Sequence, residues 1–169
     1  MGRPSYVQQF YPNNCWAACL EMWMQGEAGY AWTQDQIVNS VEDFVVGPGG
    51  INVDALGPTI DRLLNNLTLS MEWRKVESFD QKPYIETILD EVGNVYIAYR
   101  RQQGGGHANV IYGYTTSGYA VLDPDPNVGI VVKSWKEFFS IYPCFVGWRH
   151  TPAMFGSGYT GRPPWDYAP

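Results

Sequence analysis

The stretch QQFYPNNCWAACLEMW, residues 8–23, determines how the rest of the chain is interpreted. Cys15 stands directly after two asparagines and directly before apolar residues at helical spacing, which continue to Gly26. Asn13 or Asn14 is a suitable N-cap, so the sequence predicts a helix with Cys15 in its first turn. Unpaired N–H groups and the helix dipole favour an anion there and can lower a thiol pKa from about 8.5 to roughly 3.5–7.5. Cys15 is therefore either a small buried core residue or a nucleophile.

The composition indicates one packed globular domain. The chain has 169 residues, of which 45% are hydrophobic and 15% aromatic, which argues for a single core and against disorder. Acidic residues exceed basic ones, 17 against 11, and no basic block occurs, so nucleic acid is not an expected partner. No apolar run approaches the roughly 18 residues of a membrane span, and residues 1–10 lack the layout of a signal peptide. We therefore expect a soluble protein without a membrane partner, whose export would use a route that needs no signal peptide.

The order of the predicted elements indicates an α+β fold. After the first helix, the pattern predicts a helix over 33–44, which begins with a capping box of Thr33 and Gln36, and a helix over 52–64, which Pro58 could kink or break. A strand over 67–76 and a helix over 80–93 follow. Short runs rich in Val, Ile and Tyr then predict strands over 94–101, 107–115, 119–125, 129–135 and 144–150, with a short helix over 134–142. Helices first and an antiparallel sheet second are typical of α+β proteins. We assign residues 1–150 to this domain and residues 151–169 to a tail rich in Gly, Pro and aromatic residues.

His107 is the stronger of two candidates for a general base. It follows the glycines at 104–106 and begins a predicted strand, so main chain without side chains approaches it from one side. Asp123 lies 16 residues later (123 − 107), which fits a strand, a turn and a return strand, so Asp123 is expected to orient the imidazole. Asp125 is the alternative orienting group, because both aspartates also suit turns with the prolines of DPDP. His150 is interpreted as a surface residue near the tail.

A cysteine nucleophile also needs hydrogen-bond donors for the oxyanion of its tetrahedral intermediate. The N–H group of Cys15 at the start of the helix is one expected donor. Gln9, six residues earlier (15 − 9), offers a side-chain amide as the second donor, with Gln8 as its neighbour in the sequence. Exposed glutamines are common, so this spacing gains its meaning only together with the other residues.

The three cysteines do not suit a disulfide scaffold or a zinc site. Cys15, Cys19 and Cys144 cannot all pair within one chain, so at least one thiol is free. Cys19 lies one turn after Cys15 on the same helix face, and we expect it in the core. A metal site would have to collect the three cysteines and His107, and the Cys-x3-Cys spacing on a helix disfavours zinc. No metal and no organic cofactor are expected.

Taken together, these residues resemble the papain-like cysteine peptidases. In that superfamily a glutamine six residues ahead of the nucleophile forms the oxyanion hole, a Cys-Trp pair starts the central helix, and a histidine and an Asn or Asp follow on the sheet. Gln9, Cys15, His107 and Asp123 keep this order, and the resemblance spans roughly residues 8–148. NNCWAACLEM, GGGHANVIYGY and VLDPDP are closest to the compact bacterial branches, which trim bacteriocin leaders or act as delivered effectors. The resemblance implies a papain-like fold, with the nucleophile helix packed on a C-terminal antiparallel sheet.

Two features depart from the pattern of the larger relatives. In papain and the cathepsins the histidine follows the cysteine by about 130–150 residues, whereas His107 follows Cys15 by 92 (107 − 15). The second cysteine, Cys19, comes after the nucleophile and not before it. The shorter interval fits the compact branches, and the position of Cys19 leaves disulfide chemistry open.

The function implied by this resemblance is cleavage of protein or peptide substrates through a Cys-His-Asp triad. The compact, acidic chain is closest to a delivered bacterial effector or toxin, which would need an immunity protein if its targets also exist in the producer. The same triad can perform deamidation or acyl transfer, which remain alternatives. A non-catalytic module is a further alternative, since 12 Tyr and 7 Trp could form a stacking platform for a peptide or a sugar.

Overall fold

The chain forms a six-stranded antiparallel sheet with helices on both faces. The computed structural model describes residues 3–29, 31–41, 43, 45–46, 50–51, 53–64, 69–76, 82–101, 105–139 and 144–149. The helices are α1 (Cys15–Ala28), α2 (Gln34–Ser40), α3 (Val53–Leu64), α4 (Lys82–Glu91) and α5 (Trp135–Phe139). The sheet contains β3 (Met71–Val76), β4 (Val95–Arg100), β5 (Gly106–Tyr114), β6 (Tyr119–Asp123), β7 (Gly129–Lys133) and β8 (Cys144–Arg149), in the order β3-β8-β4-β5-β6-β7. The expected α+β class is confirmed.

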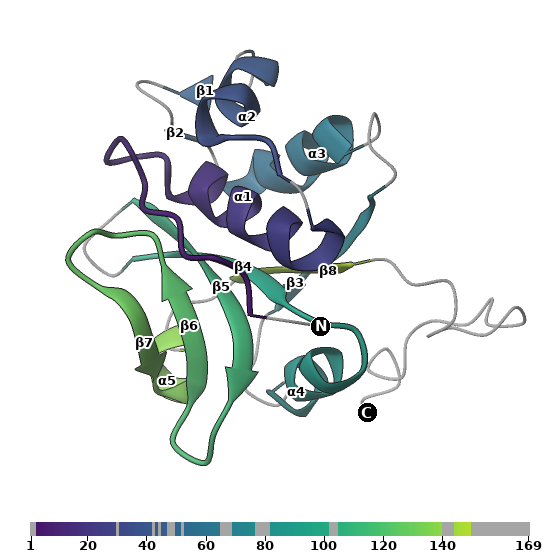
Figure 1. Cartoon of the computed structure of the whole chain (residues 1–169), viewed down its shortest axis with the longest axis vertical. Coiled ribbons are helices and arrows are strands. Elements are labelled where there is room, and N and C mark those ends of the chain that lie inside the picture. Colours follow the sequence, from purple (N-terminus) through teal and green to yellow (C-terminus); the bar gives the residue numbers. More distant parts are fainter. Residues whose placement is uncertain are drawn as a thin grey trace, which may run out of the picture.

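The two faces of the sheet carry separate apolar cores. Side chains alternate between the faces along each strand, so Tyr96 and Val110 pack toward α1, and Ile97 and Ile111 pack toward the opposite face. Figure 1 shows α1, α2 and α3 on one side of the sheet and α4 on the other. Phe138 of α5 also belongs to the core on the α4 side. The first half of the chain therefore covers one face, and the short C-terminal elements cover the other.

Helix α1 is the central element of the first core. Ten of its 14 residues are buried, because the sheet lies on one side of it and α2 and α3 lie on the other. The helix does not end at Gly26 as the sequence pattern predicts. It continues to Ala28 and ends at Gly29, whose φ of 74° is left-handed. A Cβ atom on Gly26 would lie 2.7 Å from both Pro4 Cγ and Asn94 Nδ2, so this glycine serves close packing within the helix.

Other boundaries differ from the sequence-based expectations in smaller ways. The capping box formed by Thr33 and Gln36 is present, but α2 ends at Ser40 and not near residue 44. Helix α3 runs without interruption past Pro58. A small antiparallel pair, β1 (Val45–Val46) with β2 (Gly50–Ile51), was not predicted. The tail at 151–169 and His150 lie outside the described residues.

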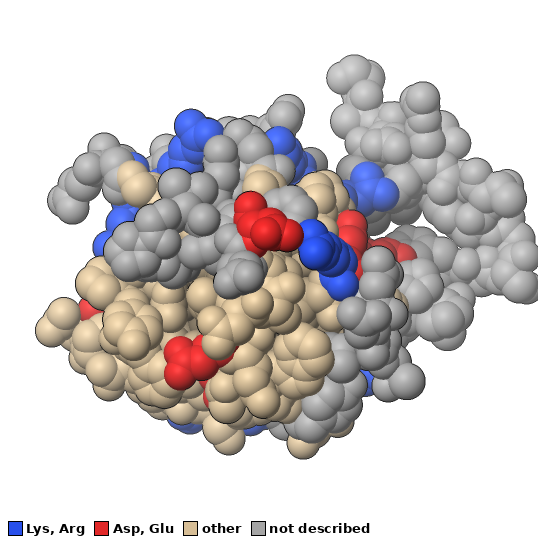
Figure 2. All heavy atoms as spheres, turned by 90° about the horizontal axis from the view of Figure 1, so that it is seen from above, with Lys and Arg blue, Asp and Glu red and all other residues tan. Residues whose placement is uncertain are grey.

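The surface of the described residues agrees with the charge balance of the sequence. On the face shown in Figure 2, the described Lys and Arg side chains lie in several separate groups, one of them next to acidic side chains, and the wide area beside them carries only acidic charge among the described residues. None of the helices among the described residues has the length and apolar character needed to cross a bilayer.

Candidate active site

Cys15 is the first residue of α1, and its side chain is 7% exposed. The preceding Asn14 occupies the N-cap position, but its side chain makes no capping hydrogen bond. The first bond of the helix runs from the N–H of Ala18 to the carbonyl of Asn14, so the amides before Ala18 have no acceptor within the helix. The helix start is thus left open around the Cys15 thiol.

The main chain supplies the polar contacts of the Cys15 thiol. Burial raises the pKa of the thiol, while backbone hydrogen bonds from Ala108 and Trp16 and the positive charge of Arg101 oppose this rise. The balance lies on the side of a raised pKa, so the resting thiol keeps its proton. A nucleophilic Cys15 consequently needs a nearby base to take that proton.

His107 lies at the start of β5, next to the end of β6. The two strands are antiparallel, so the beginning of one is adjacent to the end of the other, where Asp123 is located. The imidazole Nε2 is 2.8 Å from Asp123 Oδ1, and both side chains are buried, at 4% and 2% exposure. The ring of Tyr99 contacts the imidazole edge-on, with 5.8 Å between centroids. With Nε2 engaged by the carboxylate, Nδ1 is the ring nitrogen that remains for another partner.

The structure brings Asp123, and not Asp125, to His107. Burial raises the pKa of Asp123, but the hydrogen bond and charge of His107 and the ammonium of Lys133 outweigh it and hold the pKa well below the usual range. Asp123 Oδ1 also accepts from the N–H of Asp125 at 2.9 Å, so the turn-forming role is present as well. Asp125 Oδ1 accepts a hydrogen bond from the N–H of Asn127, and its Oδ2 lies 3.8 Å from a guanidinium nitrogen of Arg101.

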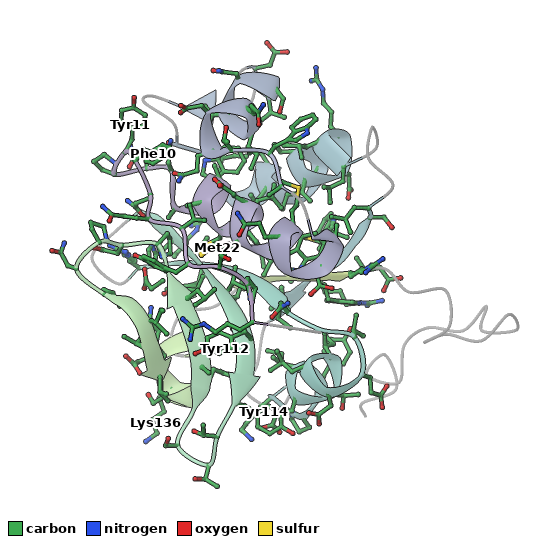
Figure 3. The ribbon with its side chains drawn as sticks, in the orientation of Figure 1. Phe10, Tyr11, Met22, Tyr112, Tyr114 and Lys136 are labelled. Carbon is green, nitrogen blue, oxygen red and sulfur yellow. The ribbon has the colours of Figure 1, made fainter. Side chains whose placement is uncertain are left out.

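Two cavities meet at His107. A cavity of about 90 Å³ is lined by Cys15 and His107 together with mainly apolar residues, among them Trp16, Ile51 and Leu56. A larger one of about 410 Å³ is more polar. Its lining includes Gln9, Tyr11, Arg101, His107 and Asp125. The loop before α1 carries Phe10 and Tyr11, which are 63% and 56% exposed and lie at the edge of the molecule in Figure 3. Cys15 and His107 therefore both line the smaller cavity, and His107 also lines the larger one.

Gln9 lies beside His107 in the larger cavity but does not line the smaller one. Its backbone N–H donates to the carbonyl of Pro124 at 3.0 Å, which ties the N-terminal segment to the turn after β6. Its side-chain Nε2 donates to the carbonyls of Tyr11 and Pro12, at 3.1 and 3.0 Å. The amide thus braces the loop that leads into α1, and an oxyanion would have to compete with these two carbonyls for its protons.

Two further polar residues belong to this site and were not predicted. Lys133 Nζ is 2.5 Å from Asp123 Oδ2 and 3.0 Å from Asn109 Oδ1. In the register of β6 and β7, Asp123 lies opposite Gly129, while Lys133 lies opposite Tyr119. The strand pairing therefore does not predict the contact between Asp123 and Lys133. Alternation alone places Asp123 and Lys133 on one face of the sheet. Cys19, by contrast, is fully buried in the core as expected.

Comparison with known proteins identifies the same fold in bacterial peptidases. A family described as "papain-like cysteine protease AvrRpt2" matches residues 3–142. No curated protein sequence matches the chain. The peptidase domain of Streptococcus ComA, a bifunctional ABC transporter of a quorum-sensing pathway, has a TM-score of 0.66 at 15% identity, over 89% of this chain and 100% of that one.

Two further solved structures extend this similarity. A C39-like peptidase from Bacillus anthracis has a TM-score of 0.58 at 15% identity, over 87% of this chain and 94% of that one. A double-glycine-motif protease from an AMS/PCAT transporter, solved with a leader peptide, has a TM-score of 0.52 at 18% identity, over 89% and 95% of the two chains. The overlap covers most of each chain, and the expected fold is confirmed.

Proposed function

Because this chain belongs to the papain-like cysteine proteases, we propose that it cleaves protein or peptide substrates through a triad of Cys15, His107 and Asp123. One observation carries the assignment of residues. Cys15 and His107 line the same cavity, and Asp123 holds the far side of the imidazole at 2.8 Å. A buried thiol at a helix start and a histidine that lines the same cavity, with its Nε2 bound to a carboxylate, are the parts needed for nucleophilic catalysis.

In the proposed reaction His107 Nδ1 takes the proton of the Cys15 thiol, and the thiolate attacks the carbonyl carbon of the scissile amide. The N–H of Cys15 and the amide of Gln9 hold the oxyanion of the tetrahedral intermediate. The imidazolium then gives its proton to the leaving amine, and a thioester of Cys15 remains. Water activated by His107 hydrolyses the thioester, which releases the acid and restores the thiol.

Asp123 keeps the imidazole in the orientation and tautomer that this cycle needs. Because its pKa is lowered, its carboxylate stays ionised and accepts a hydrogen bond from the Nε2–H group of His107 throughout the cycle. Desolvation of Cys15 makes the thiolate unstable without a cation nearby. The imidazolium formed in the same step is that cation.

The two cavities give the substrate different surroundings on the two sides of His107. The smaller one offers Trp16, Ile51 and Leu56, which suit a small apolar side chain. The larger one offers Arg101 and Asp125 next to the exposed rings of the loop before α1, which suit a polar segment. We expect an extended peptide with an apolar residue on one side of the cleaved bond and polar residues on the other.

The biological role that we propose is that of a bacterial effector or toxin, with an immunity protein where the producer contains the same targets. A second candidate is removal of a leader peptide, because one structurally similar protease is described in complex with a leader peptide. Expression of wild type and Cys15→Ala in a bacterial cytoplasm separates the two. Loss of growth and new protein termini that depend on Cys15 support an effector, whereas cleavage confined to double-glycine leaders supports the second candidate.

The catalytic assignment is tested with a peptide library made from a digested proteome. Wild type should generate new termini, and Cys15→Ala should reduce them to background without changing the unfolding curve. Cys19→Ala is the matched control, since it removes a buried thiol one turn away in the same helix and should leave cleavage intact. Mass changes without new termini would indicate deamidation or acyl transfer, and cleavage by Cys15→Ala would refute the triad.

A further inference from the structure

A partly buried lysine lies behind the aspartate of the proposed triad. Lys133 is the last residue of β7, and its side chain is 14% exposed. Its ammonium group contacts Asp123 Oδ2 at 2.5 Å, Asn109 Oδ1 at 3.0 Å and the hydroxyl of Tyr99 at 3.3 Å. Three N–H donors thus meet three oxygen acceptors, which accounts for every proton of the group. The ring of Phe138 lies 5.8 Å from the nitrogen.

The acceptors around Lys133 are themselves joined into one network that reaches His107. The hydroxyl of Tyr99 donates to Asn109 Oδ1 at 2.8 Å. Two donors to Oδ1 fix the orientation of the Asn109 amide, and its Nδ2 then lies 3.4 Å from His107 Nε2. The two carboxylate oxygens of Asp123 have different partners: Oδ1 contacts His107 Nε2, and Oδ2 contacts Lys133 Nζ. The carboxylate therefore lies between the imidazole of His107 and the side-chain nitrogen of Lys133.

We propose that Lys133 is a positioning residue that fixes the Asp123 carboxylate and moderates its attraction for the protonated imidazole of His107. This inference rests on the proposed protease function. A carboxylate alone beside a buried imidazolium would stabilise it strongly, because the attraction between opposite charges increases as water is excluded. A second cation on the same carboxylate offsets part of that attraction. His107 then releases its proton to the leaving amine more readily than it would beside an unshared aspartate.

Several other titratable groups lie close enough to the network to interact with its charges, and all of them are retained when position 133 is substituted. They are Tyr6 of the N-terminal segment, Cys15 and Cys19 of α1, Tyr99 of β4, Arg101 after β4, and Asp125 after β6. Because all of them are common to the variants compared below, a difference in pH dependence reports on Lys133.

The test is the pH dependence of kcat/KM for cleavage of one peptide by wild type, Lys133→Met, Lys133→Arg and Lys136→Met. Methionine removes the charge and keeps most of the chain length. In Lys133→Met the acid limb of this profile, where His107 must lose its proton before it can act as the base toward the Cys15 thiol, should move to higher pH by about one unit. Lys133→Arg restores a cation and should restore the position of the limb. Lys136 is exposed on α5 and points away from the site in Figure 3, so Lys136→Met is the control for loss of one charge.

The outcomes separate this inference from the proposed function. If wild type cleaves in a Cys15-dependent way but Lys133→Met has an unshifted acid limb, with kcat/KM lowered equally at all pH values, Lys133 is only structural and the inference is wrong. If Lys133→Met does not fold, Lys133→Gln keeps a donor for Asp123 without the charge and should show the same shift. Absence of Cys15-dependent cleavage in wild type contradicts the protease assignment itself.

Discussion

The two ends of α1 differ in how their polar groups are satisfied. At the first end, Asn14 provides no side-chain cap, and the thiol of Cys15 faces a cavity. At the other end, the N–H of Gly29 donates to Gln25, and Arg149 donates to the carbonyl of Glu27 at 2.7 Å. We call these the catalytic end and the anchoring end of the helix.

Side chains reinforce the same contrast. At the anchoring end Glu27 Oε1 accepts from the N–H and the Nδ2 of Asn94, and Trp23 donates to the Asn94 carbonyl at 2.9 Å. These contacts hold the helix against the sheet far from the cavity. The catalytic end can then keep amides without helical acceptors near the Cys15 thiol, because its position does not depend on a cap of its own. Changes at the catalytic end should therefore affect rate, and changes at the anchoring end should affect stability.

The largest effect should come from the aspartate next to His107. Asp123→Ala removes the acceptor of Nε2 and leaves the imidazole without a fixed tautomer, so kcat should fall by about 10⁴-fold. Asp125→Ala is the matched control in the same turn, since Asp125 does not contact the imidazole, and it should change kcat by less than about tenfold. Steady-state kinetics with one peptide compares them. A greater loss in Asp125→Ala would move the orienting role to that residue.

A smaller loss of rate should follow from the glutamine before α1. Gln9→Ala should lower kcat by about 10²–10³-fold if its amide turns from the loop carbonyls to the oxyanion. Gln8→Ala is the control at the neighbouring position. The Gln8 side chain is exposed, and its backbone carbonyl, which accepts a hydrogen bond from Gln34 Nε2, is retained in the variant. A rise in KM with unchanged kcat in Gln9→Ala would mean that the amide only shapes the loop.

At the anchoring end the expected change is in stability alone. Glu27→Ala leaves the N–H of Asn94 without its buried acceptor and should lower the free energy of unfolding by about 1–3 kcal/mol, with kcat/KM unchanged. Urea unfolding of wild type and variant measures this difference. A loss of activity larger than the loss of folded protein would contradict the separation of the two ends.

Glu27 also gives the anchoring end a pH dependence of known sign. Burial raises the pKa of its carboxyl, and the hydrogen bonds of Asn94 and the charge of Arg149 only partly oppose it. The folded state thus binds this proton more tightly than the unfolded chain, so the contribution of Glu27 is complete below about pH 4.3 and is lost as pH rises through the folded value. The stability of Glu27→Gln relative to wild type should increase from pH 5 to pH 7, and a constant difference would show that the carboxyl is not perturbed.

The sequence predicted those features that depend on neighbours along the chain. The start of α1 follows from NNCW, and the capping box of α2 follows from Thr33 and Gln36. The 16-residue separation of His107 and Asp123 predicted their contact. Two antiparallel strands joined by a short turn bring the end of the second strand back beside the start of the first. Their catalytic roles remain predictions.

Features that depend on distant parts of the chain were missed. Gly26 breaks the helical pattern by propensity, yet α1 continues because Pro4 and Asn94 pack where a side chain would be. Lys133 lies opposite Tyr119 and contacts Asp123, which lies opposite Gly129 at the other end of β7, so its side chain extends along the sheet toward that end. No local pattern records such a diagonal contact, since many conformations of a lysine are compatible with a strand.

The bond between the N–H of Gln9 and the carbonyl of Pro124 joins segments that are synthesised far apart in time. Contacts of such long sequence separation close the largest loops, so they form late in folding. Refolding followed by circular dichroism should consequently show helix formation before cleavage of a peptide returns. The same order holds on the ribosome, where Cys15 emerges long before β7 and Lys133. The cluster of Cys15, His107, Asp123 and Lys133 therefore cannot assemble until β7 has been synthesised.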